Sequence, residues 1–472
     1  MGAVKEKAQE IAIKQALKEI RKNPKENLPK LLQFVEKFDK EGMWKKQYDF
    51  MEEVVSNPEN NWYQYIIGML NDIDEKVLEK FICNFIVNSA IKGIAKTNEV
   101  KEREGCGIPW AIVMDPTTAC NMKCTGCWAA EYGKSLNLGL ETMDKIVTQG
   151  KELGTYWYLF TGGEPLVKKE EILTLCRKHS DCIFVAFTNA TLIDEEFAKQ
   201  VREVGNLSFS ISVEGTEEST DARRGKGTYQ KVMKAMDILK KEGILFGFST
   251  CDTSQNAEYV LSEEYLDTMI AKGCKYGWYF NYMPVGCDAA VELITKPEQR
   301  EEMYHKLAEY RRTKPIFTID FWNDGRFVGG CIAGGKHYMH INANGDVEPC
   351  VFIHYSNANI KDMDLLDTLK QPIFREYQKN QPFHDNLLRP CPLLDNSGKL
   401  AEMVHKCGAH STDLLHPEDV DSLCAKCQKI SKEWGKTADK LWETDPRRKE
   451  VEDKIPKERE EAKKRLAKLE NS

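Results

Sequence analysis

Three cysteines stand close together in the segment DPTTACNMKCTGCW. Cys120, Cys124 and Cys127 have the spacing C-x3-C-x2-C and directly follow a short apolar run at 110–114. A structural zinc site uses four protein ligands, so three thiolates leave one coordination position short. An iron–sulfur cluster of four irons held by three thiolates keeps one iron open to another molecule. The spacing therefore predicts a small metal cluster with one open position.

The residues around this segment resemble the radical SAM superfamily. Trp128 directly follows the cysteine motif, and the turn TGGEP at 161–165 ends the next apolar run along the chain. The resemblance implies a [4Fe–4S] cluster on Cys120, Cys124 and Cys127, whose open iron binds the amino and carboxylate groups of S-adenosylmethionine (SAM). It further implies that SAM is cleaved reductively to a 5′-deoxyadenosyl radical, which abstracts hydrogen from a substrate. The cofactors carry this chemistry, so no catalytic side chain is expected beyond the cluster and SAM.

The same resemblance implies a set of SAM-contacting residues at the ends of successive apolar runs. The glycines of TGGEP allow a close backbone approach that a side chain would block. Glu214 stands where the S-x-D-G turn of the family has Asp, so this position departs from the pattern. The cofactor-binding residues that the resemblance implies are Trp128, Gly162, Gly163, Glu164, Pro165, Asn189, Ser212, Glu214, Arg224 and Met283.

A second group of cysteines lies in the C-terminal part of the chain. GGCIAGGKHYMHINANGDVEPC places Cys331 and Cys350 on either side of Asn344-Gly345, a signal for a tight turn between two strands. This segment resembles the opening of the SPASM/twitch extension, which follows radical SAM barrels and holds auxiliary clusters, although its full cysteine pattern is incomplete here. The resemblance implies a single auxiliary [4Fe–4S] cluster that relays electrons. Its ligands would be Cys331, Cys350 and two of Cys391, Cys424 and Cys427.

A zinc site is the alternative interpretation of the later cysteines. Cys424 and Cys427 are three residues apart, so on a helix they share one face. With Cys391 and one histidine they would complete the four ligands of a structural zinc site. The histidine would be His405 or His410.

The elements that must position these residues alternate between strand and helix. Near-continuous apolar runs separated by helical windows are typical of parallel strands covered by helices. Six such units are fewer than the eight of a closed barrel, which leaves an open partial barrel or a doubly wound sheet. In either fold the site lies at the C-terminal strand ends. The six runs are 110–114, 156–160, 182–187, 207–213, 245–250 and 276–283.

The fold class that we predict is α/β, a partial (β/α)6 TIM-like barrel with additions at both ends. A helical N-terminal domain is expected over 1–105 and the barrel over 106–320. A Cys-rich auxiliary-cluster domain is expected over 321–435. The remaining residues, 436–472, are dominated by charge, which is typical of a solvated helix or tail.

Composition narrows the kind of partner that the protein has and its expected location in the cell. The chain has 472 residues, with 67 Lys and Arg against 74 Asp and Glu, so its net charge is −7. This balance argues against nucleic acid as a partner. The N-terminus has no apolar signal-peptide core, and no uncharged apolar stretch reaches the length of a membrane span. A reducing cytoplasm, where clustered thiols bind metal more often than they form disulfides, is the expected location.

The function that we expect is that of an oxygen-sensitive radical SAM enzyme acting on an unidentified small molecule, lipid or peptide. Its chemistry implies a low-potential electron donor of the flavodoxin or ferredoxin type. Two alternatives remain: a non-catalytic iron–sulfur protein for electron transfer or assembly, and a zinc-stabilised binding scaffold. TGGEP, Asn189 and Ser212 favour the enzyme, because an electron carrier has no need of a SAM-shaped set of residues.

Overall fold

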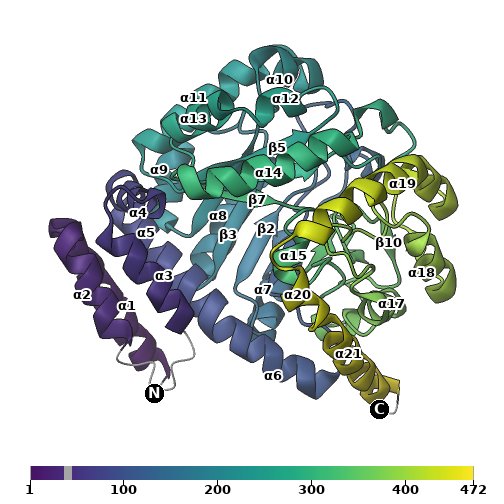
Figure 1. Ribbon diagram of the computed structural model, residues 1–472, viewed down its shortest axis with the longest axis horizontal. Coiled ribbons are helices and arrows are strands. Elements are labelled where there is room, and N and C mark those ends of the chain that lie inside the picture. The colour runs from purple at the N-terminus through teal and green to yellow at the C-terminus, as the bar shows by residue number, and fades with distance from the viewer. Residues whose placement is uncertain (1, 37–44, 471–472) are drawn as a thin grey trace.

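One sheet of nine strands lies at the centre of the structure, a computed structural model that describes residues 2–36 and 45–470 (Figure 1). The strand order is β7-β6-β5-β4-β3-β2-β1-β8-β9. All neighbouring strands are parallel except β8 and β9. The strands are β1 (Ala111–Met114), β2 (Trp157–Phe160), β3 (Ile183–Thr188), β4 (Leu207–Ser212), β5 (Phe246–Asp252), β6 (Tyr276–Asn281), β7 (Phe317–Asp320), β8 (Tyr338–Ile341) and β9 (Val347–Glu348).

The sheet is a partial barrel, as predicted. From β1 to β7 the strands follow one another in chain order, without the reversal that marks a doubly wound sheet. All six predicted strands are present, and β7 and β8 add two further parallel strands at their edges. In the described sheet β7 and β8 are not paired with each other. Aromatic rings lie there instead, with Phe321 after β7 at 6.2 Å from Tyr338 in β8 and 4.9 Å from Phe280.

Helices cover the outer face of the sheet and pack on aromatic side chains that the strands point outward. Phe209 of β4 packs against Phe197 of α9, with ring centroids 6.0 Å apart. Phe248 of β5 lies 5.4 Å from Tyr265 of α13. The helices of this layer are α7 (Leu140–Leu153), α8 (Lys169–Lys178), α9 (Glu195–Val204), α10 (Glu217–Arg224), α11 (Thr228–Lys241), α12 (Ala257–Val260), α13 (Glu263–Ala271) and α14 (Pro297–Thr313).

The N-terminal helices cover the end of the barrel where the strands begin (Figure 1). Phe85 contacts Trp110 and Trp157, which stand at the starts of β1 and β2, at 5.7 and 5.2 Å. The amide of Asn84 donates to the carbonyls of Ser180 and Cys182 just before β3. The site is therefore left to the opposite end. These elements are α1 (Gly2–Lys22), α2 (Pro24–Glu36), α3 (Lys45–Ser56), α4 (Asn61–Asp72), α5 (Glu75–Lys80), the π-helix η1 (Phe81–Gly93) and α6 (Ile94–Glu104).

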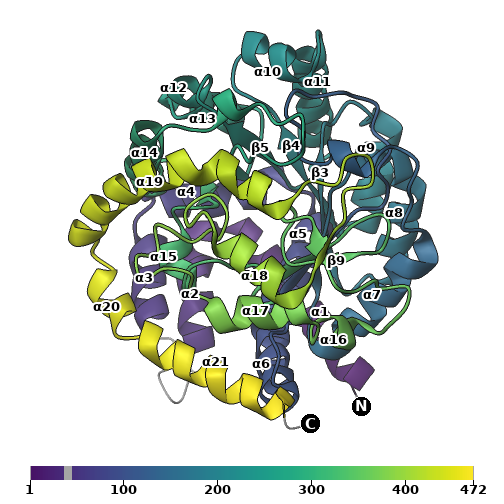
Figure 2. The same ribbon diagram turned by 90° about the vertical axis from the view of Figure 1, so that its right-hand side faces the viewer.

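The C-terminal part is mostly loops and helices beside the barrel. Figure 2 shows α19, α20 and α21 following one another past α17 and α18. None of the described helices has the length and apolar content needed to cross a membrane. The remaining elements are η2 (Ala130–Tyr132), η3 (Pro165–Lys168), η4 (Val291–Leu293), α15 (Gly325–Val328), β10 (Tyr355–Ser356), α16 (Leu365–Thr368), α17 (Pro372–Asn380), α18 (Lys399–Cys407), β11 (His410–Ser411), α19 (Val420–Thr444), α20 (Arg448–Glu452) and α21 (Ile455–Glu470).

The charged end of the chain is helical, yet it buries apolar side chains. Helix α19 runs across the predicted boundary at 435. Trp434, Leu441, Trp442 and Val451 form a small core of their own with Leu388. A purely solvated tail therefore does not describe this part of the chain. Residues 1, 37–44 and 471–472, which belong to the predicted first and last segments, lie outside the described residues.

Candidate functional site

The three N-terminal cysteines share one loop that leaves β1 at the C-terminal end of the barrel. Burial raises the pKa of the Cys120 thiol to about 11, and the charges of Cys124 and Cys127 add to that rise, so the three thiols are neighbours. In the described residues no three His, Cys, Asp or Glu side chains converge as they would on one metal ion. A four-iron cluster does not require that, because each thiolate binds a different iron. The three-thiol donor set fits such a cluster.

The turn TGGEP packs directly on this cysteine loop. The amide of Gly163 donates to the carbonyl of Thr117 at 3.0 Å, and that of Glu164 donates to the carbonyl of Ala119 at 2.9 Å. A Cβ added to Gly163 would lie 2.3 Å from the oxygen of Ala119. A Cβ on Gly162 would lie 2.9 Å from the Cβ of Asp115, and Gly162 has a φ of +96°. The two glycines thus let the TGGEP turn and the cysteine loop touch backbone to backbone.

Gly163→Ala is expected to push the cysteine loop out of place. The added methyl group would meet backbone oxygens of Thr118 and Ala119 at 2.5 and 2.3 Å, so the loop has to move. We expect less iron at the first cysteine group and a loss of about 1–3 kcal/mol in the free energy of unfolding. Gly68→Ala is the control, because its new methyl group meets only the flexible ends of Lys275 and Asp72. Normal iron content in Gly163→Ala would contradict this account of the turn.

Glu164 and Asn189 are brought together, but not as free ligand-binding groups. Glu164 is buried and accepts hydrogen bonds from the hydroxyl of Thr188 at 2.6 Å and the amide of Asn189 at 2.8 Å. Burial raises the pKa of Glu164 above its usual value. The side chain of Asn189 donates to Asn121 at 2.9 Å, within the cysteine loop. Glu164 therefore fixes the end of β3, and Asn189 ties that end to the loop.

Glu214, which replaces the Asp of the expected turn, reaches two arginines. Its Oε1 accepts from Arg223 at 2.7 Å and from Nε of Arg224 at 2.6 Å. Its Oε2 accepts from the amide of Cys251 at 3.2 Å. Burial would raise the pKa of Glu214, but the two guanidinium groups outweigh it and hold the pKa below its usual value. The cysteine loop joins this group, because the amide of Thr125 donates to the carbonyl of Arg223.

The other predicted cofactor-binding residues, Ser212, Pro165 and Met283, lie at or just after strand ends. Ser212 ends β4, in register with Ser249 of β5, and is partly exposed. Pro165 is buried as the first residue of η3. Met283 is a core side chain whose carbonyl accepts from the amide of Val285 at 2.9 Å. The placement of Pro165 and Met283 is explained by packing alone.

Cys331, Cys350 and Cys391 lie together in the C-terminal part. Burial raises the pKa of Cys350 to about 12, and the charge of Cys331 adds to it. Burial also raises the pKa of Cys391, with Asp395 and Cys331 adding to the rise. Asp395 acts in the same way on Cys427, so it is a neighbour of three of the thiols.

Cys424 and Cys427 share a buried face of α19, as predicted from their spacing. The Cys424 thiol lies beside the backbone amides of Gly398 and Ala401. Both histidines of the zinc alternative are exposed, and Nε2 of His405 lies 2.8 Å from Asp421. This arrangement disfavours the zinc alternative. All sixteen cysteines lie in the described residues, and all are free of disulfide bonds.

Aromatic rings next to the two cysteine groups contact each other. Trp128, which follows Cys127, has its ring centroid 6.0 Å from that of Phe352, two residues after Cys350. Trp128 also contacts His354 at 5.9 Å and His340 at 5.9 Å. The side chain predicted to bind SAM thus also joins the two parts of the molecule.

The sequence interpretation missed a buried polar network beside Trp128. His340 lies between Asp115 and Glu348, with Nε2 3.1 Å from Asp115 and Nδ1 2.6 Å from Glu348. The hydroxyl of Tyr132 donates to Glu348 at 2.9 Å. The available signal was a histidine inside an apolar run, YMHI, paired with an acidic residue eight positions later.

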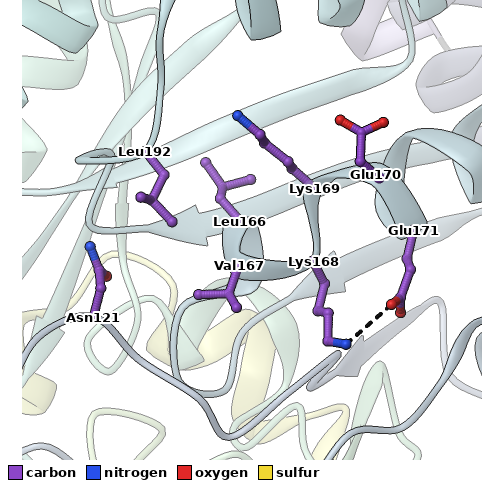
Figure 3. A pocket seen from close by; sticks show the side chains of 8 residues that line it. All are labelled: Asn121, Leu166, Val167, Lys168, Lys169, Glu170, Glu171 and Leu192. Carbon is purple, nitrogen blue, oxygen red and sulfur yellow. Dashed lines mark hydrogen bonds and ion pairs between the residues drawn. The ribbon is translucent and has the colours of Figure 1, made fainter.

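A surface pocket of about 480 Å³ lies on the outer side of the cysteine loop (Figure 3). Among the residues that line it, Asn121 belongs to the loop, and Leu166, Val167 and Leu192 supply apolar surface. Lys168 forms an ion pair with Glu171 at 3.2 Å along its edge. The pocket is therefore next to the cysteine loop but is not formed by the three thiols.

Family models match the segment with the first cysteine group and the segment that carries Cys331, Cys350 and Cys391. A family model described as Radical SAM superfamily matches residues 114–262, and one described as Iron-sulfur cluster-binding domain (SPASM) matches 331–393. The Fe-coproporphyrin III synthase of Methanosarcina barkeri is 28% identical over 234 residues, which cover 46% of this chain and 57% of that protein. The AdoMet-dependent heme synthase of Oleidesulfovibrio alaskensis is 25% identical over 311 residues, 58% of this chain and 77% of that protein.

Among solved structures, Streptococcus suis SuiB bound to precursor peptide SuiA has a TM-score of 0.49 and 18% identity, covering 58% of this chain and 68% of that chain. The chain spans little more than half the length of the first curated relative. The two family models show that this chain contains a radical SAM domain over residues 114–262 and, after it, an iron–sulfur cluster-binding SPASM domain over residues 331–393.

Proposed function

We propose that this chain cleaves SAM reductively at a [4Fe–4S] cluster on Cys120, Cys124 and Cys127 and abstracts hydrogen from an organic substrate. The observation that carries the proposal is the backbone contact between the three-cysteine loop and the TGGEP turn, where Gly163 meets Ala119. A protein that only transfers electrons would need the three-cysteine loop but not the TGGEP turn beside it. The contact supports a site that holds a metal cluster and a second ligand side by side.

A [4Fe–4S] cluster held by Cys120, Cys124 and Cys127 would supply the electron for reductive cleavage of SAM. The residues of this chain hold and shape the site. Glu164 fixes the turn after β3, and Glu214 orients Arg223 and Arg224 toward the cysteine loop. Burial raises the pKa of the Cys127 thiol, and the nearby charges of Arg223 and Arg224 offset part of that rise. Positive charge at this place favours the thiolate that a metal cluster requires.

The test is anaerobic reconstitution with iron and sulfide, followed by dithionite and SAM. We expect 5′-deoxyadenosine and methionine to form, as measured by chromatography. Bound iron with no SAM cleavage would instead support the alternative of a non-catalytic electron-transfer protein. Bound zinc without iron would support the binding scaffold.

We further propose one auxiliary cluster, held by Cys331, Cys350, Cys391 and Cys427. Asp395 is a neighbour of Cys331, Cys391 and Cys427, whereas Cys424 lies beside the start of α18. The hydroxyl of Tyr338 donates to the Cys350 sulfur at 2.7 Å. A cluster with four protein ligands suits electron relay, and the Trp128–Phe352 contact lies between it and the first site.

Cys427→Ala is expected to remove the auxiliary cluster, and Cys424→Ala is expected to keep it. The two positions are three residues apart on the same buried face of α19, so they are matched in burial and backbone. Iron per chain should fall by about one four-iron cluster in Cys427→Ala. The measurement is iron and sulfide content after anaerobic reconstitution. The reverse result, with iron lost only in Cys424→Ala, would overturn this ligand assignment.

For the substrate, the inner face of the barrel supports a planar apolar group. Trp278 and Phe280 of β6 alternate with outward residues, and their rings stack at 5.6 Å. Both are partly exposed, as is Phe187 of β3, 5.9 Å from each of them. Two relatives are named for Fe-coproporphyrin III and heme, which are planar macrocycles. A small molecule, a lipid or an aromatic side chain of a peptide could present such a group.

The proposed chemistry requires a low-potential electron donor, for which we propose a flavodoxin or ferredoxin. A cytoplasmic location stays a prediction, in keeping with the free cysteines of the described chain. The segment boundaries at 105, 320 and 435 also stay predictions.

A further inference from the structure

Asp115, His340 and Glu348 form a line of charged side chains that water does not reach. All three are 0% exposed. Nδ1 of His340 forms a hydrogen bond with Glu348 at 2.6 Å, whereas Nε2 lies 3.1 Å from Asp115 without the geometry of a hydrogen bond, so the contact with Asp115 is an electrostatic one. Burial disfavours the charged ring, but the two carboxylates outweigh it and raise the pKa of His340 to about 10.

One end of this line lies under the SAM-binding turn. The hydroxyl of Thr161 donates to Asp115 at 2.7 Å, and the amide of Thr161 donates to the carbonyl of Met114 at 3.0 Å. A Cβ on Gly162 would lie 3.0 Å from the Cγ of Asp115. Asp115 therefore contacts the first two residues of TGGEP, and a displacement of its side chain would displace the turn.

The other end lies on the strand pair that carries an auxiliary ligand. Glu348 is in β9, two residues before Cys350, and accepts from Tyr132, Thr412 and Asn342. His340 is in β8, two residues after Tyr338, whose hydroxyl donates to the Cys350 sulfur. The antiparallel register pairs His340 with Glu348 directly. The hydrogen bond to Cys350 and the His340–Glu348 pair are thus neighbours on one rigid ribbon.

We propose that His340 is a positioning residue that couples the two sites, so that loss of the auxiliary cluster weakens SAM binding at the first cluster. This inference rests on the function proposed above. Its physical basis is that β8 pairs with β1 along its whole length. Two side chains of β8 then contact both sites, because His340 lies 3.1 Å from Asp115 and Tyr338 donates a hydrogen bond to Cys350. A charge buried between two others tolerates little displacement, because each separation costs energy in a medium of low polarity.

The experiment is a cycle of variants read by SAM affinity. The change that SAM causes in the electron paramagnetic resonance spectrum of the reduced first cluster is titrated in wild type, His340→Gln, Cys391→Ala and the double variant. Cys391→Ala removes an auxiliary ligand away from β8 and β9. We expect each single change to raise the Kd for SAM about tenfold, which is 1.4 kcal/mol, and the double change to raise it no further. Coupled sites give this loss of additivity.

The control is His179→Gln, another buried histidine paired with a carboxylate, Asp144 at 2.8 Å, on the outer helix α8 side. Its Kd should equal that of wild type. If His340→Gln fails to hold iron, Asp115→Asn replaces it, because the amide keeps the shape and loses the charge. Independent, multiplying effects of the two changes, or unchanged affinity in both, would overturn the coupling while leaving the proposed function intact. A wild-type first cluster that does not respond to SAM would overturn both.

Discussion

Cys124→Ala is expected to reduce 5′-deoxyadenosine formation to background. Cys124 stands between the other two cysteines of the loop, and a four-iron cluster with only two thiolates has two irons without a protein ligand. The auxiliary site, at the far side of the Trp128–Phe352 contact, should keep its iron. The measurement is product formation together with iron content, both under anaerobic conditions. We expect a loss of about four irons per chain relative to wild type.

The matched control is Cys274→Ala, which removes a buried thiol in the core between α13 and β6. Its thiol is ordinary core packing, so product formation should persist. SAM cleavage retained in Cys124→Ala, at normal iron content, would mean that the cluster is held elsewhere. Loss in both variants would mean that the effect is one of folding rather than of ligation.

Much of the barrel could be predicted because its strands are nearly continuous apolar runs. β3 (IFVAFT), for example, has a single polar residue, and it was located from sequence. β7 was not predicted, because polar and apolar residues alternate in it. β8 was predicted as one strand of the hairpin around Asn344-Gly345, which the structure confirms, but not as a further strand of the barrel. In β8 the polar residue is His340, which is buried only because Asp115 and Glu348 neutralise it.

For the site, the sequence predicted the positions of the residues but not their hydrogen-bond partners. Sequence order places TGGEP, Asn189 and Glu214 at successive strand ends, and the structure agrees. The sequence does not reveal that Glu164 accepts hydrogen bonds from the Thr188 hydroxyl and the Asn189 amide. Nor does it reveal that the longer side chain of Glu214 reaches Arg223 as well as Arg224. Such pairings depend on the register of neighbouring strands and helices, which only the folded chain defines.

Asp395→Asn is expected to cause the largest loss of stability. Asp395 lies 2.7 Å from Arg300, with side chains 0% and 1% exposed, and Arg300 stacks on Trp434 at 4.0 Å. The amide keeps the shape but leaves the guanidinium buried without its counter-charge. We expect a decrease of about 3–5 kcal/mol in the free energy of unfolding, measured by urea titration. Asp237→Asn is the control, because its ion pair with Lys272 is exposed and should contribute less than about 1 kcal/mol.

The same residue connects stability to the auxiliary site. The second oxygen of Asp395 accepts the amide of Cys391 at 2.9 Å, so it orients the loop that supplies this thiol. The double variant Arg300→Met with Asp395→Leu removes both charges, and apolar replacement of a buried ion pair is often neutral in stability. It cannot restore an acceptor for the Cys391 amide. We therefore expect recovered stability with auxiliary iron still reduced. Recovery of both would show that Asp395 acts on the thiol only through the fold, and recovery of neither would show that the ion pair itself is not the source of the loss.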